Sequence, residues 1–202
     1  MNKIKGLIFD LDGVLVNTKK IHFDALNLAL KKVNAKEISF KDHLNIYDGL
    51  PTNKKLSILN DKKILNKKFN SKVIKIKQEN TLKLLNKFIK FSPKIYNTFL
   101  KLSKNYKISL ATNAVKKTLD LCVKKLRINK FISYSYSNED VSSNKPHPQV
   151  YLKCLVNMAL KPSETLIFED SHHGVMAAQD SGCLLYTVKN ILDINYSNIA
   201  NL

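Results

Sequence analysis

The chain has few cysteines and no long apolar run, and both shortages exclude classes of protein. Its 202 residues include three cysteines, Cys122, Cys154 and Cys183, an odd number with no CxxC pair. This pattern argues against a disulfide framework and against a zinc site, and favours buried thiols. No apolar stretch approaches the roughly 20 residues that a membrane helix needs. Acidic residues also interrupt the first apolar residues too early for a signal peptide, so we expect a cytoplasmic protein with no membrane partner.

Arginine is almost absent, although the chain is strongly basic. Of the 34 basic residues 33 are lysine, and the formal net charge is +18. Such a charge suits nucleic-acid binding, because Lys and Arg neutralise phosphates. Arginine, however, is the side chain preferred for bidentate contacts to bases and phosphates, and 22 asparagines indicate a compositional bias along the whole chain. A basic nucleic-acid-binding protein is therefore the less favoured alternative, and the charge would equally attract anionic metabolites.

The segment from Leu7 to Leu15 is the most informative stretch. Three apolar residues, Leu7 to Phe9, lead directly to two carboxylates, Asp10 and Asp12, and then to Gly13. A short apolar run bounded by a turn signal is typical of a strand buried on both faces in a parallel sheet. In open α/β sheets ligands bind at the carboxyl ends of the strands, so the two acids are well placed for metal binding or catalysis.

The rest of the chain alternates between apolar runs and helical periodicity. Further strands are expected over residues 108–113, 131–136, 165–168 and 183–188, and helices over 96–103, 119–126 and 150–160. Residues 17–90 read as mainly helical, and they carry +12 of the net charge, from 18 Lys against 6 Asp and Glu. The polar tail from Asp193 is expected to fray. This order predicts an α/β fold with a doubly wound, mainly parallel, Rossmann-like sheet and an inserted small α-helical domain.

Three later segments place polar residues at predicted strand ends or helix starts. Thr112-Asn113 ends the second strand, Lys145-Pro146-His147-Pro148 precedes a helix, and Glu169-Asp170 ends an apolar strand. The prolines restrict the backbone beside Lys145, so that its ammonium can be aimed. Mg²⁺ prefers hard oxygen ligands and keeps several waters, so one or two carboxylates at one edge of a sheet are enough to bind it.

These four segments, in this order, resemble the signatures of the haloacid dehalogenase superfamily, most closely the branch of phosphoglycolate phosphatase-like and β-phosphoglucomutase-like enzymes. The resemblance implies a catalytic core in residues 1–16 and 91–202 and a helical cap in 17–90. It implies that Asp10 is the nucleophile and Asp12 the acid/base. It also implies that Thr112 and Asn113 bind the phosphoryl group and that Lys145 neutralises its charge. The implied cofactor is Mg²⁺, with Asp10, Asp12 and Asp170 as ligands and Glu169 bound directly or through water.

Inside the predicted cap, the resemblance points to His22 and to the loop at Gly49 as substrate contacts. A lone histidine is often structural, so both roles of His22 stay open. Lys54 and Lys55 follow the loop. We interpret them as solvated side chains, with contact to a substrate anion as the alternative.

The expected activity is a Mg²⁺-dependent phosphatase that hydrolyses a small phosphorylated metabolite, such as a sugar phosphate or a phosphoglycolate-like compound, and acts as a monomer. A phosphomutase of the same family is the alternative. Mutases grip the second phosphate with an arginine of the cap, and this chain has Thr52 where β-phosphoglucomutase-like caps place that arginine. A catalytically silent binding protein would usually lack the nucleophile or a metal ligand, and both are present.

Overall fold

The structure is a computed structural model that describes residues 3–200, and it separates into two compact units. One unit is helical and contains Thr18–Phe88, and the other contains the chain up to Asn17 and from Ile89 onward. The strands are β1 (Gly6–Phe9), β2 (Lys107–Ala111), β3 (Tyr134–Tyr136), β4 (Thr165–Glu169) and β5 (Leu184–Thr187). The α-helices are α1 (Lys19–Lys31), α2 (Phe40–Asp42), α3 (Thr52–Asp61), α4 (Asn70–Phe88), α5 (Pro93–Leu102), α6 (Lys116–Leu126), α7 (Gln149–Met158), α8 (His172–Asp180) and α9 (Tyr196–Ala200).

All five strands form one parallel sheet in the order β3-β2-β1-β4-β5. The chain begins in the centre of the sheet, so β1 pairs with both β2 and β4, and Phe9 lies opposite Leu110 on one side and Phe168 on the other. Parallel pairing requires a crossover between successive strands, and the helices provide it. The predicted doubly wound α/β fold is confirmed. Because β1, β2 and β4 are adjacent, the residues that follow them reach the same edge of the sheet.

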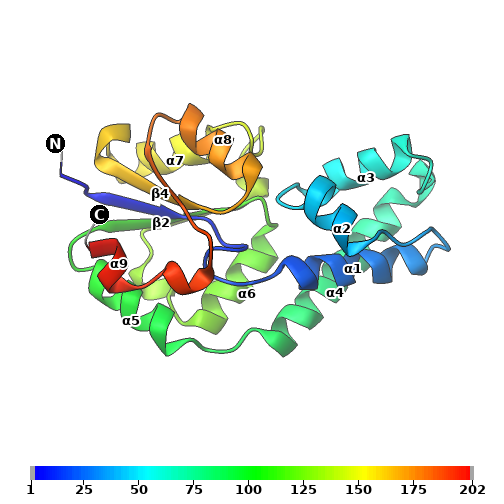
Figure 1. Cartoon of the computed structure of the whole chain (residues 1–202), viewed down its shortest axis with the longest axis horizontal. Helices are drawn as coiled ribbons and strands as arrows, with labels where there is room; N and C mark the ends of the chain where they lie inside the picture. Colours follow the sequence, from blue (N-terminus) through cyan, green and yellow to red (C-terminus); the bar gives the residue numbers. More distant parts are fainter. Residues whose placement is uncertain (1–2, 201–202) are drawn as a thin grey trace. The chain divides into compact units, whose positions relative to one another are not determined.

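The sheet is covered on both faces by helices, as Figure 1 shows, with α7 and α8 on one face and α5, α6 and α9 on the other. Under α7 and α8 a buried cluster joins Ile8 and Ile167 of the strands to Tyr151, Cys154 and Ala177 of the helices. On the opposite face the ring of Phe9 lies 5.1 Å from that of Phe99, measured between centroids. Burial on both faces explains why the central strand β1 and residues 166–168 of β4 are continuous apolar runs.

Two elements of this unit differ from the prediction. The strand expected over 131–136 is shorter, because residues Asn129–Phe131 form a 3₁₀ turn and β3 begins at Tyr134. The tail is not frayed up to residue 200, since Tyr196–Ala200 forms α9 with Ile199 buried, while residues 201 and 202 lie outside the described part. The Lys94 ammonium donates a 2.6 Å hydrogen bond to the Leu192 carbonyl just before α9.

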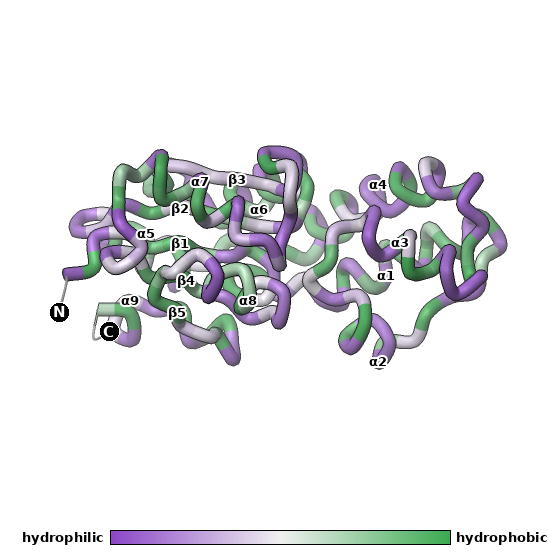
Figure 2. The backbone as a smooth tube through the Cα atoms, turned by 90° about the horizontal axis from the view of Figure 1, so that it is seen from above, coloured by the Kyte–Doolittle hydropathy of each residue, from purple (hydrophilic) through white to green (hydrophobic). Residues whose placement is uncertain are grey.

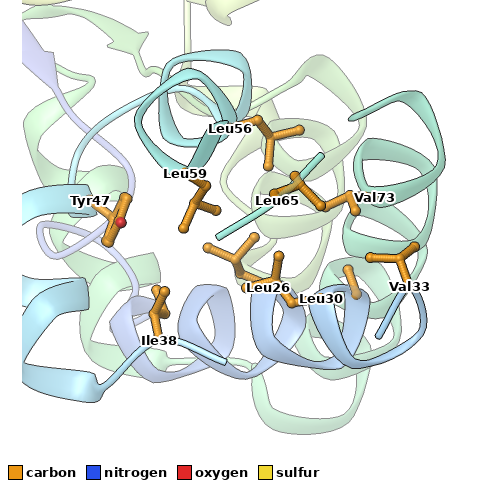
Figure 3. Packing of buried hydrophobic residues seen from close by; sticks show 10 residues of the cluster. Leu26, Leu30, Val33, Ile38, Tyr47, Leu56, Leu59, Leu65 and Val73 are labelled. Carbon is orange, nitrogen blue, oxygen red and sulfur yellow. The ribbon is translucent and has the colours of Figure 1, made fainter. Parts of the chain in front are cut away.

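The helical unit has a core of its own, drawn in Figure 3. Helix α1 supplies Leu26, Ala29 and Leu30 of the predicted i, i+3, i+4, i+7 stripe, and Val33 follows just after the helix ends; all four are buried. The stripe packs on residues from the other helices and the segments between them, namely Ile38, Tyr47, Leu56, Leu59, Leu65 and Val73. Figure 2 shows α1, α3 and α4 changing between hydrophobic and hydrophilic residues along each helix, as expected for helices with one buried face.

Polar contacts fix the connections of the helical unit. The buried Asn27 amide accepts a hydrogen bond from the Ile38 N–H and donates one to the Ile38 carbonyl, both 2.9 Å long. A π-helical segment, His43–Tyr47, leads to the loop at Gly49, whose φ is +72°.

Lys54 is exposed, as we expected, but the expectation was wrong for Lys55, which is only 4% exposed. Helical periodicity turns Lys55 to the same side of α3 as Leu56 and Leu59, which lie in the core.

No helix within residues 3–200 is both long and apolar enough to span a bilayer.

Candidate active site

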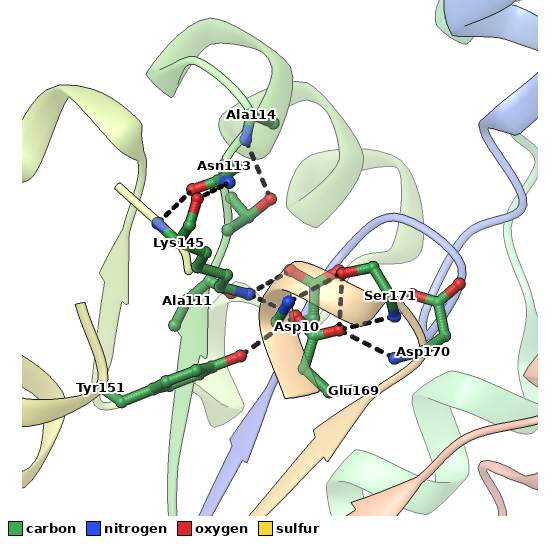
Figure 4. A network of polar contacts seen from close by, with 11 residues as sticks. Asp10, Ala111, Asn113, Ala114, Lys145, Tyr151, Glu169, Asp170 and Ser171 are labelled. Atoms are coloured by element: carbon green, nitrogen blue, oxygen red, sulfur yellow. Dashed lines mark hydrogen bonds and ion pairs between the residues drawn. The ribbon is translucent and has the colours of Figure 1, made fainter. Parts of the chain in front are cut away.

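The site is centred on Asp10, the first residue after β1. Its N–H donates a 3.0 Å hydrogen bond to the Phe168 carbonyl of β4, so the backbone pairing continues as far as the acid. Only 6% of Asp10 is exposed. Three groups accept hydrogen bonds from the ammonium of Lys145: Asp10 Oδ1 at 2.7 Å, Glu169 Oε1 at 2.6 Å and the Ala111 carbonyl at 2.9 Å (Figure 4). The carboxyl ends of three neighbouring strands thus meet at one buried lysine.

The backbone of Lys145 is also held in place, by the side chain of Asn113. Its N–H donates a hydrogen bond to Asn113 Oδ1 at 3.1 Å, and its carbonyl accepts one from Asn113 Nδ2 at 3.2 Å, so the backbone is clamped by a side chain from the end of β2. Neighbouring Thr112 is 2% exposed, and its hydroxyl oxygen accepts a 3.1 Å hydrogen bond from the Ala114 N–H. A hydroxyl that accepts one hydrogen bond can still donate another.

Glu169 ends β4 and is fully buried. Its Oε1 accepts hydrogen bonds from Lys145 and, at 3.1 Å, from the hydroxyl of Tyr151. Its Oε2 accepts from the Asp170 N–H, the Ser171 N–H and the Ser171 hydroxyl at 2.8, 3.0 and 3.1 Å. Ser171 is also the N-cap of α8, where its hydroxyl accepts from the Gly174 N–H. A Cβ on Gly174 would lie 1.8 Å from Glu169 Oε1, so only glycine allows this close approach of helix and carboxylate.

Burial and the neighbouring charges change the pKa values of the groups in the site. Burial raises the pKa of Asp10 well above its ordinary value, and the Lys145 ammonium, which acts in the opposite direction, offsets this only in part because Glu169, Asp12 and Asp170 are also near. Burial alone would lower the pKa of Lys145, but the Asp10 and Glu169 carboxylates raise it well above normal. Lys145 is therefore a permanent cation in a cluster with surplus negative charge.

The cluster suits a divalent cation. One carboxylate oxygen from each of Asp10, Glu169 and Asp170 lies within 4.8 Å of the others. Hard carboxylate oxygens are the ligands that Mg²⁺ takes. Gly13, at a φ of +89°, packs directly against the Asp170 carboxylate, and a Cβ there would lie 2.1 Å from Asp170 Oδ2. The backbone after β1 is thus shaped around this carboxylate.

The predicted site residues fall into two groups. Asp10, Thr112, Asn113, Lys145, Glu169 and Asp170 lie together at one edge of the sheet, with half-buried Asp12 near enough to raise the pKa of Asp10. His22 on α1 and Gly49 in the loop before α3 belong to the helical unit, and their roles stay predictions.

Two residues of the network were not predicted as site residues, Tyr151 and Ser171. The sequence places Tyr151 on the inner face of α7, where it reads as a core residue. The available signal is the phenol itself, because a buried tyrosine hydroxyl usually finds a polar partner.

Fold and site together define an α/β protein whose centre is a buried aspartate paired with a lysine beside further carboxylates. The family described as haloacid dehalogenase-like hydrolase matches residues 7–188. The chain belongs to this family of hydrolases, which confirms the resemblance and the expected class of enzyme.

Similar proteins of known sequence or structure agree with this assignment. A "phosphorylated carbohydrates phosphatase" of Thermotoga maritima is 26% identical in a match that covers 89% of this chain and 82% of the Thermotoga chain. A "pyrophosphatase PpaX" of Bacillus mycoides is 25% identical in a match that covers 89% of this chain and 81% of the Bacillus chain. The crystal structure of a β-phosphoglucomutase from Clostridium difficile superimposes with a TM-score of 0.83 and 20% identity, covering 98% of this chain and 96% of that one. At that identity the structural likeness describes the fold alone.

Proposed function

We propose that the protein is a Mg²⁺-dependent phosphatase that hydrolyses small phosphorylated metabolites through an aspartyl-phosphate. The observation that carries this proposal is the buried Asp10–Lys145 ion pair at a sheet edge that also carries Asp12, Asp170 and Glu169. Two similar proteins named as phosphatase and pyrophosphatase support the class of substrate. The helical unit, Thr18–Phe88, would serve as the cap, with His22 and Gly49 among its substrate contacts.

In the first half of the reaction a carboxylate oxygen of Asp10 attacks the phosphorus of the monoester. The new O–P bond gives the aspartyl-phosphate, and the bond between phosphorus and the leaving oxygen breaks. Asp12, entering protonated, gives its proton to the leaving oxygen, so the alcohol departs neutral and Asp12 becomes a carboxylate. Lys145 stays charged throughout and balances the negative charge that Asp10 shares with the phosphoryl group.

In the second half Asp12 takes a proton from a water molecule, whose oxygen attacks phosphorus. The bond to Asp10 breaks, inorganic phosphate leaves, and both aspartates return to their starting states. Thr112 donates its hydroxyl proton toward a phosphoryl oxygen in both halves. Phosphoryl transfer depends mainly on positioning and charge stabilisation, which the fixed Lys145 and Thr112 provide.

Asp10 and Asp170 are the residues that would hold Mg²⁺, with Asp12 as a further ligand through its backbone carbonyl oxygen, which would leave its carboxyl group free to transfer protons. A bound Mg²⁺ would neutralise phosphoryl oxygens and draw the phosphate into line with Asp10. It would also favour the ionised form of Asp10, whose pKa is raised by burial and by the neighbouring carboxylates.

The direct test is release of inorganic phosphate from a panel of phosphoglycolate, hexose phosphates, pentose phosphates and pyrophosphate, with Mg²⁺ present. Wild-type protein is expected to hydrolyse at least one of these, and Asp10→Asn to be slower by a factor of about 1,000 or more, since the amide keeps the shape but cannot attack phosphorus. A folded Asp10→Asn variant that keeps a substantial fraction of the activity would contradict the proposal, as would a wild type that is inactive on the whole panel.

A phosphomutase is the alternative within the same family. The sequence of the helical unit contains no arginine to grip a second phosphate, and Thr52 carries no charge. Incubation with β-glucose 1-phosphate and a trace of the bisphosphate separates the two activities. Free phosphate is expected to form faster than glucose 6-phosphate, and the reverse order would favour the mutase.

A basic nucleic-acid-binding protein remains the other class of function. Such a protein would hold DNA at low salt and release it steeply as salt rises, which a filter-binding titration measures. We expect no such binding, and we expect the enzyme to act as a cytoplasmic monomer.

A further inference from the structure

The hydrogen bonds of Glu169 are unusual for a metal ligand. Five donors reach its two oxygens: the Lys145 ammonium and Tyr151 hydroxyl on Oε1, and three groups of Asp170 and Ser171 on Oε2. A carboxylate offers about four lone-pair directions in total. Protein donors therefore use the whole acceptor capacity of Glu169, although one of its oxygens lies within 4.8 Å of oxygens of Asp10 and Asp170.

Tyr151 touches this arrangement in two ways. Its hydroxyl donates to Glu169 Oε1 at 3.1 Å, and the Lys145 ammonium lies 4.8 Å from the centre of its ring, a distance that suits a cation–π contact. Tyr151 is fully buried on the rigid helix α7, within the core cluster that also contains Ile8 and Ile167. A side chain fixed by packing thus contacts both partners of the Lys145–Glu169 ion pair.

We propose that Tyr151 is a positioning residue, which together with Glu169 aims the Lys145 ammonium at Asp10, and that Glu169 serves this support and not the metal. Lys145 has a flexible four-carbon side chain that must be held in one geometry to act on Asp10. Asn113 fixes its backbone, and Tyr151 with Glu169 fixes its charged end. The inference rests on the proposed function only in giving Lys145 a role in phosphoryl transfer.

The test variant is Tyr151→Phe, which keeps the ring and removes the hydroxyl. Tyr134→Phe is the matched control, because Tyr134 lies on β3 with 37% of its surface exposed. Thermal unfolding of both variants checks that the fold is kept.

The first readout needs no activity. In lysine-labelled protein the Lys145 ammonium, identified by the loss of its NMR signal in Lys145→Arg, should exchange slowly with water, because it is buried and donates three hydrogen bonds. In Tyr151→Phe this exchange should become at least several-fold faster, whereas Tyr134→Phe should match the wild type. An unchanged exchange rate in Tyr151→Phe would overturn the positioning role.

The second readout separates lysine positioning from metal binding. Calorimetric titration with Mg²⁺ alone should give Tyr151→Phe the wild-type Kd within about twofold, while kcat falls about tenfold and KM stays nearly constant, as expected for loss of a hydrogen bond to a charged group. Mg²⁺ affinity that falls in parallel with kcat would mean that Glu169 is a metal ligand, and would overturn the proposal. If the wild type hydrolyses nothing, the proposed function fails, whereas ammonium exchange and Mg²⁺ affinity still decide the inference.

Discussion

At the level of single residues, two carboxylates of the site contact one ammonium and a third carboxylate lies near both of them. Asp10 and Glu169 each accept a hydrogen bond from Lys145, and an oxygen of Asp170 lies within 4.8 Å of an oxygen of each. Burying charges is costly unless opposite charges compensate them. The surplus of negative charge therefore favours a cation beside Asp170, and it adds to burial, the main cause, in raising the pKa of Asp10.

The first prediction concerns Gly13, where the backbone meets the Asp170 carboxylate. Gly13→Ala should abolish phosphatase activity and weaken Mg²⁺ binding at least tenfold, because the new Cβ would lie 2.1 Å from Asp170 Oδ2. Steady-state kinetics and calorimetry measure the two effects.

Gly182→Ala is the matched control for Gly13→Ala. Gly182 also has a positive φ, +73°, but a Cβ there would meet only Pro162, at 3.7 Å. The control should lose about 1 kcal/mol of stability from backbone strain and keep full activity. Equal losses of activity in both variants would show that backbone strain, and not displacement of Asp170, is responsible.

Much of the site could be predicted from the sequence because each strand delivers its acid or hydroxyl directly after an apolar run. Asp10 follows Phe9, Thr112 follows Ala111, and Glu169 follows Phe168. Tyr151 could not be predicted in this way. Its hydroxyl meets Glu169 only because α7 packs across the sheet, and helical spacing alone reports which side chains are buried, not which polar atom they reach.

At the level of elements, helix α8 and the strands before it show which local signals are reliable. The run Thr165–Phe168 and the serine cap at Ser171 both predict where β4 ends and α8 begins. Helix α9 was missed because its five residues include only two apolar ones, Ile199 and Ala200, and its stability depends on packing against α5. Propensity cannot predict a helix this short, since isolated helices of that length are unstable.

The second prediction concerns His43 in the π-helical segment His43–Tyr47, which stacks on Phe40 and is fully buried. Burial, and then the nearby Lys55 ammonium, lowers the pKa of His43 to about 4. The pKa of a histidine in an unfolded chain is about 6.5. Between these two pKa values the unfolded chain binds more protons than the folded protein does. The contribution of His43 to the free energy of unfolding is therefore fully present above pH 6.5 and is lost as the pH drops toward 4.

The size of this effect follows from the shift of about 2.5 pH units, which corresponds to roughly 3 kcal/mol. Urea unfolding followed by circular dichroism at pH 7 and pH 4.5 measures it. His43→Phe keeps an aromatic ring beside Phe40 and should lose distinctly less stability on acidification than the wild type. The same loss in both proteins would exclude His43 as the source.

At the level of the whole molecule, charge is distributed unevenly between sequence segments. Residues 17–90 carry +12 of the total of +18, and the acids of the site all belong to the other part of the chain. A positive potential of this size attracts anionic metabolites and raises their rate of encounter, more so at low salt. The basic composition, which first suggested nucleic acid, is thus compatible with a phosphorylated substrate.

The third prediction is that turnover requires Mg²⁺. Phosphatase activity should vanish with a chelator and return when Mg²⁺ is added, while Ca²⁺ should restore little. The larger and looser shell of Ca²⁺ would disturb the alignment of Asp10 with phosphorus. Full activity of a metal-free preparation, verified by elemental analysis, would contradict a role of Asp170 as metal ligand.

The central claim is that Asp10 carries the phosphoryl group during turnover, and trapping that group tests it most directly. The protein is mixed with Mg²⁺ and radiolabelled acetyl phosphate, quenched in acid, and digested for peptide mapping. We predict one labelled peptide, the one that contains Asp10, whose label hydroxylamine removes, and no label in Asp10→Asn. Label on another residue, or an Asp10→Asn variant that still turns over substrate, would contradict the account.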